Sequence, residues 1–359
     1  MIHLIGLPHT SFDADRFSSC AYTAKAVRTV RMLRSLGRDV EVYWGGDGDG
    51  VVSCLAPRRQ AHYWGEWRAD VLPQVVWDFG RPEWVEFNAN MIARVEERIE
   101  PGDVVAFVMA CPPVIDHFLP RNVCVEIGVG YEGLGRGTFA CFESYTWMHN
   151  RYGAHGIGDG RAFDAVIPNV VYPDEWDMGA DEGYALFVGR LLQRKGPHVA
   201  AQIAERAGLR LLMAGAGVAS NVRGRITAVD GTVIEGDHVT HVGAVGGQAR
   251  RDLFAHAHVL ICPTLYIGPW EGVHAEAMMS GVPVVAPDYG VFTETLPERQ
   301  RYRMIRQAVD AVNDPVWERG QAWRDHATAL CGPERCSTLY GEWFDRIDTL
   351  ANAGPGWYA

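Results

Sequence analysis

Lysine is almost absent from this sequence. Of its 33 basic residues only Lys25 and Lys195 are lysines, and the other 31 are arginines. No uninterrupted apolar run approaches about 18 residues, so nothing in the sequence predicts a membrane-spanning helix. The opening MIHLIGLPHT has neither a charged stretch nor a long apolar one, and it therefore predicts no secretory signal.

Paired cysteine motifs and nucleotide fingerprints are missing as well. The eight cysteines form no CxxC pair in a chain of 39.7 kDa, so we expect reduced thiols in a cytoplasmic protein and no zinc site. Gly215-Ala-Gly217 lacks the third glycine of a dinucleotide fingerprint, which argues against an oxidoreductase. Asp47-Gly-Asp49 resembles a metal-binding DxD, but it lies in a glycine-rich turn, and we expect no metal.

The charge balance is acidic. With 33 basic and 44 acidic residues the net charge is −11, so a protein that binds nucleic acid or membranes with its whole surface is excluded. Any anionic partner must be held by a local patch. A hydrophobic content of 48% indicates a folded chain, and 359 residues favour two domains.

Strand and helix patterns alternate along the chain. We expect strands at 2–7, 40–44, 75–78, 104–109, 123–127, 184–188, 209–214, 239–242, 259–263 and 282–286. Helices are expected at 21–36, 84–99, 197–207, 248–256 and from 273. This alternation predicts an α/β chain with two doubly wound Rossmann-like domains that face each other across a cleft.

The domain boundaries follow from composition. Residues 168–183 are rich in acids and poor in apolar side chains, which is typical of a linker. We expect an acceptor-side domain over 1–170, a nucleotide-binding domain over 171–334, and a helical segment over 335–359 that packs back on the first domain.

The segment Val-Gly-Arg-Leu-Leu-Gln-Arg-Lys-Gly-Pro predicts an anion site. A strand ends at Gly189, Arg190 follows, and Lys195 precedes a helix. Free backbone N–H groups and the helix dipole at such a junction attract phosphate, and the two side chains add positive charge. Taken alone, the segment also fits a solvated helix start.

A second segment, GPWEGVHAEAM, runs from a loop into a helix. Glu276 falls in the first helical turn, where it is able to accept hydrogen bonds from a vicinal diol, and Gly272 lets the backbone approach a ligand closely. The alternative is a helix-terminal carboxylate without a ligand.

Taken together, these segments resemble a known family. The ordered series VGR…RKG, LMAGAG, HVGAV and GPWEGVHAEAM…GVPVVA is similar to the nucleotide-sugar domain of family-4 glycosyltransferases of the GT-B fold. The similarity covers about residues 166–300. It implies a retaining glycosyltransferase that uses a nucleoside-diphosphate sugar as co-substrate and needs no other cofactor and no metal.

The resemblance also implies roles for individual residues. Arg190 and Lys195, next to Gly189, would hold the diphosphate. Val245 would lie against the base, Gly272 and Val273 would donate backbone N–H groups to phosphate, and Glu276 would bind the ribose hydroxyls.

One position departs from the family pattern. The family has a second Glu eight residues before the ribose Glu, where this chain has Gly268. We consider Glu271 as the carboxylate that reaches the same space. The departure leaves a second hypothesis, a catalytically silent sugar-nucleotide-binding protein of the same fold.

The N-terminal half offers weaker candidates for the acceptor side. Ser19 precedes a predicted helix and is placed to present N–H groups to an anion. Glu126 and Glu132 follow a buried strand, where either is a candidate to orient the acceptor hydroxyl, although loop carboxylates are common there. We interpret His149 as structural.

The predicted helix 21–36 has an arginine stripe. At about 100° per residue, one arc contains the apolar Ala26, Val30, Leu33 and Leu36, and the opposite arc contains Arg28, Arg31, Arg34 and Arg38. Such a stripe is either a solubilising surface or a contact for anionic membrane lipid or DNA phosphate. We therefore expect a cytoplasmic protein, with membrane-peripheral attachment as one option. The acceptor class stays open among lipid, glycan, small molecule and hydroxylated DNA base.

Overall fold

The computed structural model describes residues 1–17, 20–70, 75–135, 137–158, 161–222 and 224–353. These residues form two compact units. The first unit holds the chain up to Val170, apart from a short stretch that begins at Arg68, and the segment from Glu334 onward. The second unit holds that short stretch and Val171–Pro333. No helix in the described part of the chain is long and apolar enough to cross a membrane.

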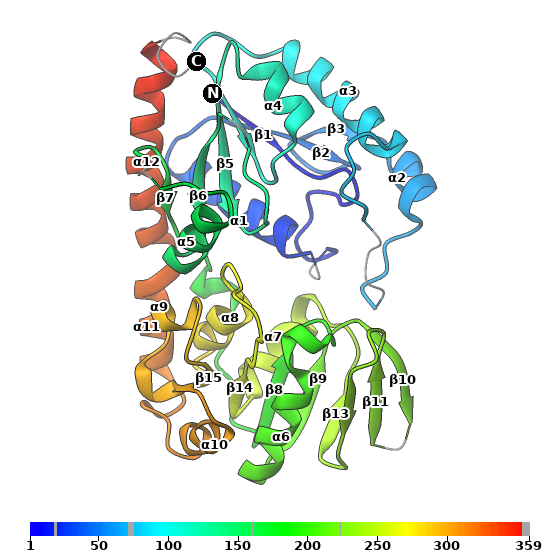
Figure 1. Cartoon of the computed structure of the whole chain (residues 1–359), viewed down its shortest axis with the longest axis vertical. Coiled ribbons are helices and arrows are strands. Elements are labelled where there is room, and N and C mark those ends of the chain that lie inside the picture. The colour runs from blue at the N-terminus through cyan, green and yellow to red at the C-terminus, as the bar shows by residue number, and fades with distance from the viewer. Residues whose placement is uncertain (18–19, 71–74, 136, 159–160, 223, 354–359) are drawn as a thin grey trace. The chain divides into compact units, whose positions relative to one another are not determined.

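The first unit is built on a seven-stranded sheet of order β3-β2-β1-β4-β5-β6-β7, with every neighbouring pair parallel (Figure 1). Its strands are β1 (Ile2–Ile5), β2 (Val40–Gly45), β3 (Val51–Leu55), β4 (Val104–Phe107), β5 (Val123–Val129), β6 (Phe139–Phe142) and β7 (Ala165–Val166). Its helices are α1 (Ala21–Ser35), α2 (Pro57–Trp64), α3 (Pro82–Glu96), α4 (Pro112–Phe118), α5 (Tyr145–Ala154) and α12 (Pro333–Ala353). Apolar, β-branched strands are buried on both faces, as parallel sheets require.

One predicted strand is wrong. Residues 75–78 join no sheet, and the place beside β2 is taken by β3, which the prediction missed. The Trp84 indole of α3 donates to the carbonyl oxygen of Val76 at 2.9 Å, so this segment is held against a helix instead. Val51–Leu55 is a short strand that directly follows a glycine-rich turn, which leaves little local pattern to mark it.

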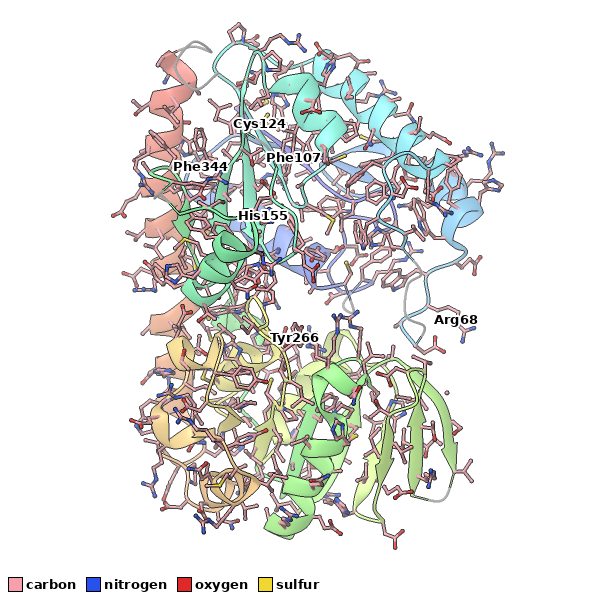
Figure 2. All side chains as sticks on the ribbon, in the orientation of Figure 1. Arg68, Phe107, Cys124, His155, Tyr266 and Phe344 are labelled. Atoms are coloured by element: carbon pink, nitrogen blue, oxygen red, sulfur yellow. The ribbon has the colours of Figure 1, made fainter. Side chains whose placement is uncertain are left out.

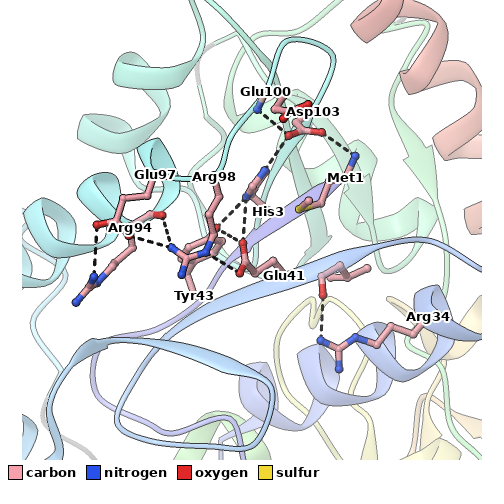
Figure 3. A network of polar contacts seen from close by, with 11 residues as sticks. Met1, His3, Arg34, Glu41, Tyr43, Arg94, Glu97, Arg98, Glu100 and Asp103 are labelled. Atoms are coloured by element: carbon pink, nitrogen blue, oxygen red, sulfur yellow. Dashed lines mark hydrogen bonds and ion pairs between the residues drawn. The ribbon is translucent and has the colours of Figure 1, made fainter.

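The amino edge of this sheet is closed by a polar network (Figure 3). His3 is fully buried, with one ring nitrogen 3.0 Å from the Tyr43 hydroxyl and the other 3.1 Å from Asp103. Asp103 also accepts from the Met1 ammonium at 2.7 Å. These polar groups satisfy one another's hydrogen-bonding capacity. In doubly wound sheets, ligands bind at the opposite edge, where the strands have their carboxyl ends.

The C-terminal helix α12 is part of the first unit. Its buried face carries Trp343, Phe344 and Ile347, and the Trp343 indole donates to the carbonyl oxygen of Phe163 at 2.6 Å (Figure 2 labels Phe344). On α12, Asp345 pairs with Arg38 at 2.6 Å, and Asp348 pairs with the same guanidinium.

The second unit repeats the doubly wound plan. Its parallel sheet has the order β13-β9-β8-β14-β15-β16. The strands are β8 (Tyr184–Val188), β9 (Arg210–Ala214), β13 (Val239–His241), β14 (Val259–Ile261), β15 (Val284–Pro287) and β16 (Arg301–Tyr302). The helices are α6 (Pro197–Ala207), α7 (Gly247–His256), α8 (Val273–Met279), α9 (Phe292–Thr295), α10 (Ile305–Asn313) and α11 (Gln321–Cys331). The α/β prediction with two Rossmann-like domains is confirmed.

Two features of the second unit were not predicted. A three-stranded antiparallel sheet follows β9, formed by β10 (Val218–Val222), β11 (Arg225–Ala228) and β12 (Val233–Glu235). The expected linker at 168–183 also contains core residues, because Trp176 is buried and packs edge-on against Phe254 with ring centroids 5.4 Å apart. Trp176 has acidic residues on both sides in the sequence, and for this reason the segment was predicted to be a linker.

All eight cysteines are free and buried. Burial raises the pKa of several thiols to about 12, among them Cys111 and Cys262. Such thiols are poor nucleophiles and poor metal ligands at neutral pH.

The packing of α12 leads to a prediction. Replacing Trp343 by Ala should lower the free energy of unfolding of the first unit by about 3–5 kcal/mol, because a fully buried ring and its hydrogen bond are lost. Urea unfolding measures this loss, and Glu342→Ala, at an exposed neighbouring position, is the control. Equal stability of the two variants would show that α12 contributes little to the unit.

Candidate functional site

The site of the second unit begins where β8 ends. Beyond Gly189 the chain makes a short 3₁₀ turn, Gln193–Lys195, and α6 starts at Pro197. Gly196 between them has a left-handed backbone (φ 71°), and a Cβ there would lie 2.2 Å from the carbonyl oxygen of Pro263. Only glycine fits this close approach, which sets the position of Lys195 at the carboxyl edge of the sheet.

Lys195 lies in a charged cluster with two residues from the loop after β14. Its ammonium is 2.5 Å from Glu271 Oε2 and 2.9 Å from the Tyr266 hydroxyl (Figure 2 labels Tyr266). Tyr266 in turn donates to Glu271 Oε1 at 2.8 Å. The Lys195 side chain is 17% exposed and that of Glu271 5%, so this ion pair is largely shielded from water.

The electrostatics of this cluster favour a charged pair. Burial works to raise the pKa of the Glu271 carboxyl, but the Lys195 ammonium and the Tyr266 hydroxyl outweigh it and hold that pKa below its ordinary value. Burial alone would lower the pKa of Lys195, and Glu271 reverses the effect, so that its pKa lies above the ordinary value.

Glu271 has an unusual backbone. Among the described residues it is the one non-glycine residue with a positive φ, 59°. A side chain at Gly268 would place its Cβ 2.3 Å from Glu271 Oε1, so the Glu271 carboxylate occupies the space beside position 268. A left-handed non-glycine residue costs roughly 1–3 kcal/mol, and such strain concentrates at functional sites.

The carbonyl of Glu271 is fixed by a histidine on α8. His274 donates from Nδ1 to this oxygen at 2.6 Å, and its ring lies against those of Trp270 and Phe292. Complete burial lowers the pKa of His274 to about 4, so the ring is neutral at pH 7.

Glu276 lies in the first turn of α8 and has a partner that the sequence reasoning missed. Arg250 of α7 donates to Glu276 Oε2 from Nη2 at 2.5 Å and from Nε at 3.2 Å. Val245 lies half-buried just before α7. No local motif marks Arg250, because 26 residues separate it from Glu276.

Arg190 and Lys195 have different surroundings in this structure. Arg190 is exposed, and its side chain has no hydrogen bond or ion pair among the described residues, whereas Lys195 is bound to Glu271. Gly272 is exposed at the start of α8, and Val273 is half-buried beside it.

In the first unit, Glu126 is fully buried, and its hydrogen-bond donors lie in the segment between β5 and β6. It accepts hydrogen bonds from the Gly135 backbone at 2.6 Å, from Tyr131 at 2.5 Å and from the Thr138 hydroxyl. Burial raises its pKa above the ordinary value despite these donors. Its contacts therefore point to a loop-closing role and not to contact with an acceptor.

The remaining acceptor-side candidates are dispersed. Glu132 and His149 are exposed, and Ser19 falls outside the described residues. The carboxylates of Asp47 and Asp49 are exposed in the loop between β2 and β3. Within the described ranges, no group of three His, Cys, Asp or Glu side chains is arranged to hold a metal.

The arginine stripe of α1 is shorter than predicted. Arg31 and Arg34 are exposed and Arg28 is half-buried, but Arg38 is tied to α12 by its two aspartates and lies over the Phe344 ring. The exposed Leu36 also departs from the predicted apolar arc, because it follows the end of the helix.

The buried His274 leads to a pH prediction. Its folded-state pKa of about 4 lies below the ordinary 6.5, so the unfolded chain binds more protons between these values. Stability of the second unit should therefore fall as pH drops through this window, by about 1.4 kcal/mol per pH unit from this residue.

His274→Leu should remove that part of the slope in urea unfolding measured from pH 7 to pH 4. His149→Gln, at an exposed position, should keep it. An unchanged slope in His274→Leu would show that His274 is not held neutral by the fold.

Comparison with known proteins places these features in context. Residues 182–314 match the family model of group 1 glycosyl transferases. Spore coat protein SA of Bacillus subtilis (strain 168) is 26% identical over 145 residues. This match covers 36% of the chain and only 38% of that protein.

Solved structures match over nearly the whole chain. AviGT4, a glycosyltransferase involved in avilamycin A biosynthesis, is 19% identical with a TM-score of 0.66, covering 97% of this chain and 98% of its own. Sucrose-phosphate synthase from Thermosynechococcus elongatus is 15% identical with a TM-score of 0.65, covering 97% of this chain and 100% of its own. Identities this low establish the fold alone. The chain thus has the GT-B fold, and its residues 182–314 match the model of group 1 glycosyl transferases.

Proposed function

We propose that this protein is a retaining glycosyltransferase that moves a sugar from a nucleoside-diphosphate sugar to an acceptor hydroxyl. The observation that carries the proposal is the partly buried cluster of Lys195, Glu271 and Tyr266 at the carboxyl edge of the second sheet. It lies within the segment that matches the group 1 model. A shielded ammonium at a strand–helix junction suits a diphosphate.

The donor is bound by groups from three loops in this proposal. Lys195 and Arg190 hold the diphosphate beside Gly189, and the backbone N–H groups of Gly272 and Val273 complete its coordination. The ribose hydroxyls donate to Glu276, which Arg250 holds in place, and Val245 lies against the base.

Glu271 faces the transferred sugar. Its carboxylate occupies the space beside Gly268, and its left-handed backbone is maintained by Lys195, Tyr266 and His274. Such a carboxylate accepts hydrogen bonds from sugar hydroxyls, which favours one donor sugar over its epimers. The strained backbone of Glu271 favours a catalytic protein over a silent binding protein, because backbone strain concentrates at active sites.

The chemistry needs no strong base. The acceptor oxygen bonds to the anomeric carbon on the face from which the diphosphate leaves, and the leaving diphosphate accepts the acceptor proton. Lys195, Arg190 and the start of α8 stabilise the charge that develops on the diphosphate. Metal is not required in this scheme.

Two structural neighbours suggest the first ligands to test. They are the pneumococcal O-GlcNAc transferase GtfA in complex with UDP and GlcNAc, and Anabaena Alr3699/HepE in complex with UDP and glucose. The acceptor class stays open among lipid, glycan, small molecule and hydroxylated DNA base. Exposed Arg31 and Arg34 favour an anionic one, such as membrane lipid or DNA.

The decisive experiment is calorimetric binding of UDP, followed by an assay of UDP release from UDP-glucose and UDP-N-acetylglucosamine. Lys195→Ala should weaken UDP binding by about 1.5–3 kcal/mol, the scale of a charge-assisted hydrogen bond. The variant also leaves Glu271 unpaired, so Lys195→Met combined with Glu271→Gln removes both charges and preserves folding.

Both variants should bind UDP weakly, while Arg206→Ala on the exposed face of α6 should bind as the wild type does. Wild-type affinity in the double variant would contradict the donor site. Binding without any sugar release would support the silent alternative.

The ribose contact has its own prediction. Glu276→Gln keeps the shape but weakens the acceptor, so the affinity for UDP should fall about tenfold. The affinity for 2′-deoxy-UDP should change much less, because the missing hydroxyl already removes the contact. Glu205→Gln, an exposed glutamate on α6, is the matched control. An equal loss for both nucleotides would assign Glu276 a structural role.

A further inference from the structure

A buried histidine links the amino ends of three neighbouring strands of the first unit (Figure 3). His3 on β1 contacts the Tyr43 hydroxyl on β2 through Nδ1, and it contacts Asp103, directly before β4, through Nε2. Its exposed fraction is 0%. A histidine ring donates hydrogen bonds from one nitrogen when neutral and from both when charged. The direction of each contact therefore tells which form is present.

The hydroxyl hydrogen of Tyr43 is used for Glu41. The phenol oxygen and Glu41 Oε2 lie 2.5 Å apart, a distance that requires a hydrogen between them. Glu41 has no hydrogen to give, because its other oxygen is paired with the Arg98 guanidinium at 3.0 Å and the group is a carboxylate. Burial and the hydrogen bond to Glu41 raise the pKa of Tyr43 above its ordinary value, so the phenol keeps its hydrogen. Toward His3, the Tyr43 oxygen is therefore an acceptor.

Asp103, on the other side of the ring, is an acceptor as well. Its Oδ1 accepts from the Met1 ammonium at 2.7 Å, and its Oδ2 accepts from the Glu100 backbone N–H at 2.8 Å. Burial works to raise the pKa of Asp103, but these donors outweigh it and hold that pKa below its ordinary value. Both nitrogens of His3 thus face acceptors, which only the charged imidazolium satisfies.

We propose that His3 is an imidazolium in this structure and that its loss of a proton reverses the hydrogen bond of Tyr43, so that the amino edge of the first sheet is a pH-sensitive switch. Once the proton has left Nδ1, that nitrogen accepts, and the Tyr43 hydroxyl turns from Glu41 to His3. Nε2 keeps its hydrogen and its bond to Asp103. Hydroxide takes the proton and becomes water, and Glu41 loses its Tyr43 partner. This inference does not depend on the proposed function.

The charged groups around the ring give the sign of the pH dependence. From β2, Glu41 lies 3.9 Å from Nδ1, and from the start of β4, Asp103 lies 3.1 Å from Nε2. Arg98, after α3, pairs with Glu41, and the Met1 ammonium pairs with Asp103. Glu41 is 27% exposed and lines an open cavity of about 620 Å³, so water reaches this end of the network. The two carboxylates favour the charged ring, and the stability that they provide is lost as the pH rises and His3 loses its proton.

Nitrogen NMR of the full chain tests the inference directly, because ring nitrogens with and without a hydrogen have well separated chemical shifts. The His3 signals are assigned through the backbone of β1. At pH 6 both ring nitrogens should carry a hydrogen, and near pH 9 Nδ1 alone should have lost it. Amide exchange in β2, corrected for the intrinsic rate at each pH, should then speed up about tenfold, the scale of one hydrogen bond to a charged group.

Tyr43→Phe is the matched variant, because it keeps the buried ring and removes only the hydroxyl. Neither Nδ1 nor Glu41 then has a partner at position 43 at any pH, so the pH-dependent change in β2 exchange should disappear. Tyr152→Phe is the control. It removes another hydroxyl that donates to a carboxylate of the same unit, that of Asp164 at 2.8 Å, and it should leave the pH response of β2 unchanged.

Two results would overturn the inference. A single N–H on His3 at pH 6 would show that the ring is neutral and that one of its two contacts is not a hydrogen bond. Two N–H groups that persist near pH 9 with unchanged exchange in β2 would show a fixed structural charge and no switch. Neither result bears on UDP binding, because both measurements are made without a nucleotide.

Discussion

The buried ion pair between Lys195 and Glu271 is the interaction on which the candidate site depends. Lys195 occupies its position because Gly196 permits a turn that no other residue fits. Glu271 occupies its own because a left-handed backbone turns its carboxylate into the space beside Gly268. Either charge without the other would destabilise the fold, because an unpaired charge that is shielded from water is costly in free energy. Each therefore fixes the other, and the loop after β14 is held in one conformation.

The two lysines of the chain occupy comparable settings. Lys25 is buried and Lys195 is largely shielded from water, and each lies at the carboxyl edge of a parallel sheet and is bonded to a glutamate. Each ammonium is also close to a tyrosine ring, that of Tyr22 for Lys25 at 4.7 Å and that of Tyr266 for Lys195 at 5.0 Å. A lysine presents a compact point charge that fits such a space, whereas the planar guanidinium of arginine needs a wider one. This difference accounts for the retention of lysine at two positions in a chain that otherwise uses arginine.

Periodicity predicted most of the fold, because apolar runs separated by amphipathic segments set the order of strands and helices. The boundaries of β8 and α6 were predicted to the residue. Prediction failed at Val51–Leu55, where a short strand follows directly on a turn. It also failed at 218–235, where β10 is exposed and β11 and β12 have only four and three residues.

The site was predictable only where residues share a motif. Lys195 and Glu276 were singled out by their places at helix starts. Arg250 and Tyr266 were not, because their partners lie 26 and 71 residues away and no spacing rule links them. Arg38 was assigned to an exposed stripe because its aspartate partners on α12 lie more than 300 residues away. Such pairings become visible only when the fold brings the elements together.

Hydrogen–deuterium exchange with and without UDP tests the central claim most directly, because it locates a bound donor along the whole chain. A donor on the Lys195 cluster should slow exchange in residues 189–196 and 266–277, where backbone N–H groups face the diphosphate. The amino edge of the first sheet around His3 should not change. Protection confined to other segments, or no protection at saturating UDP, would contradict the account.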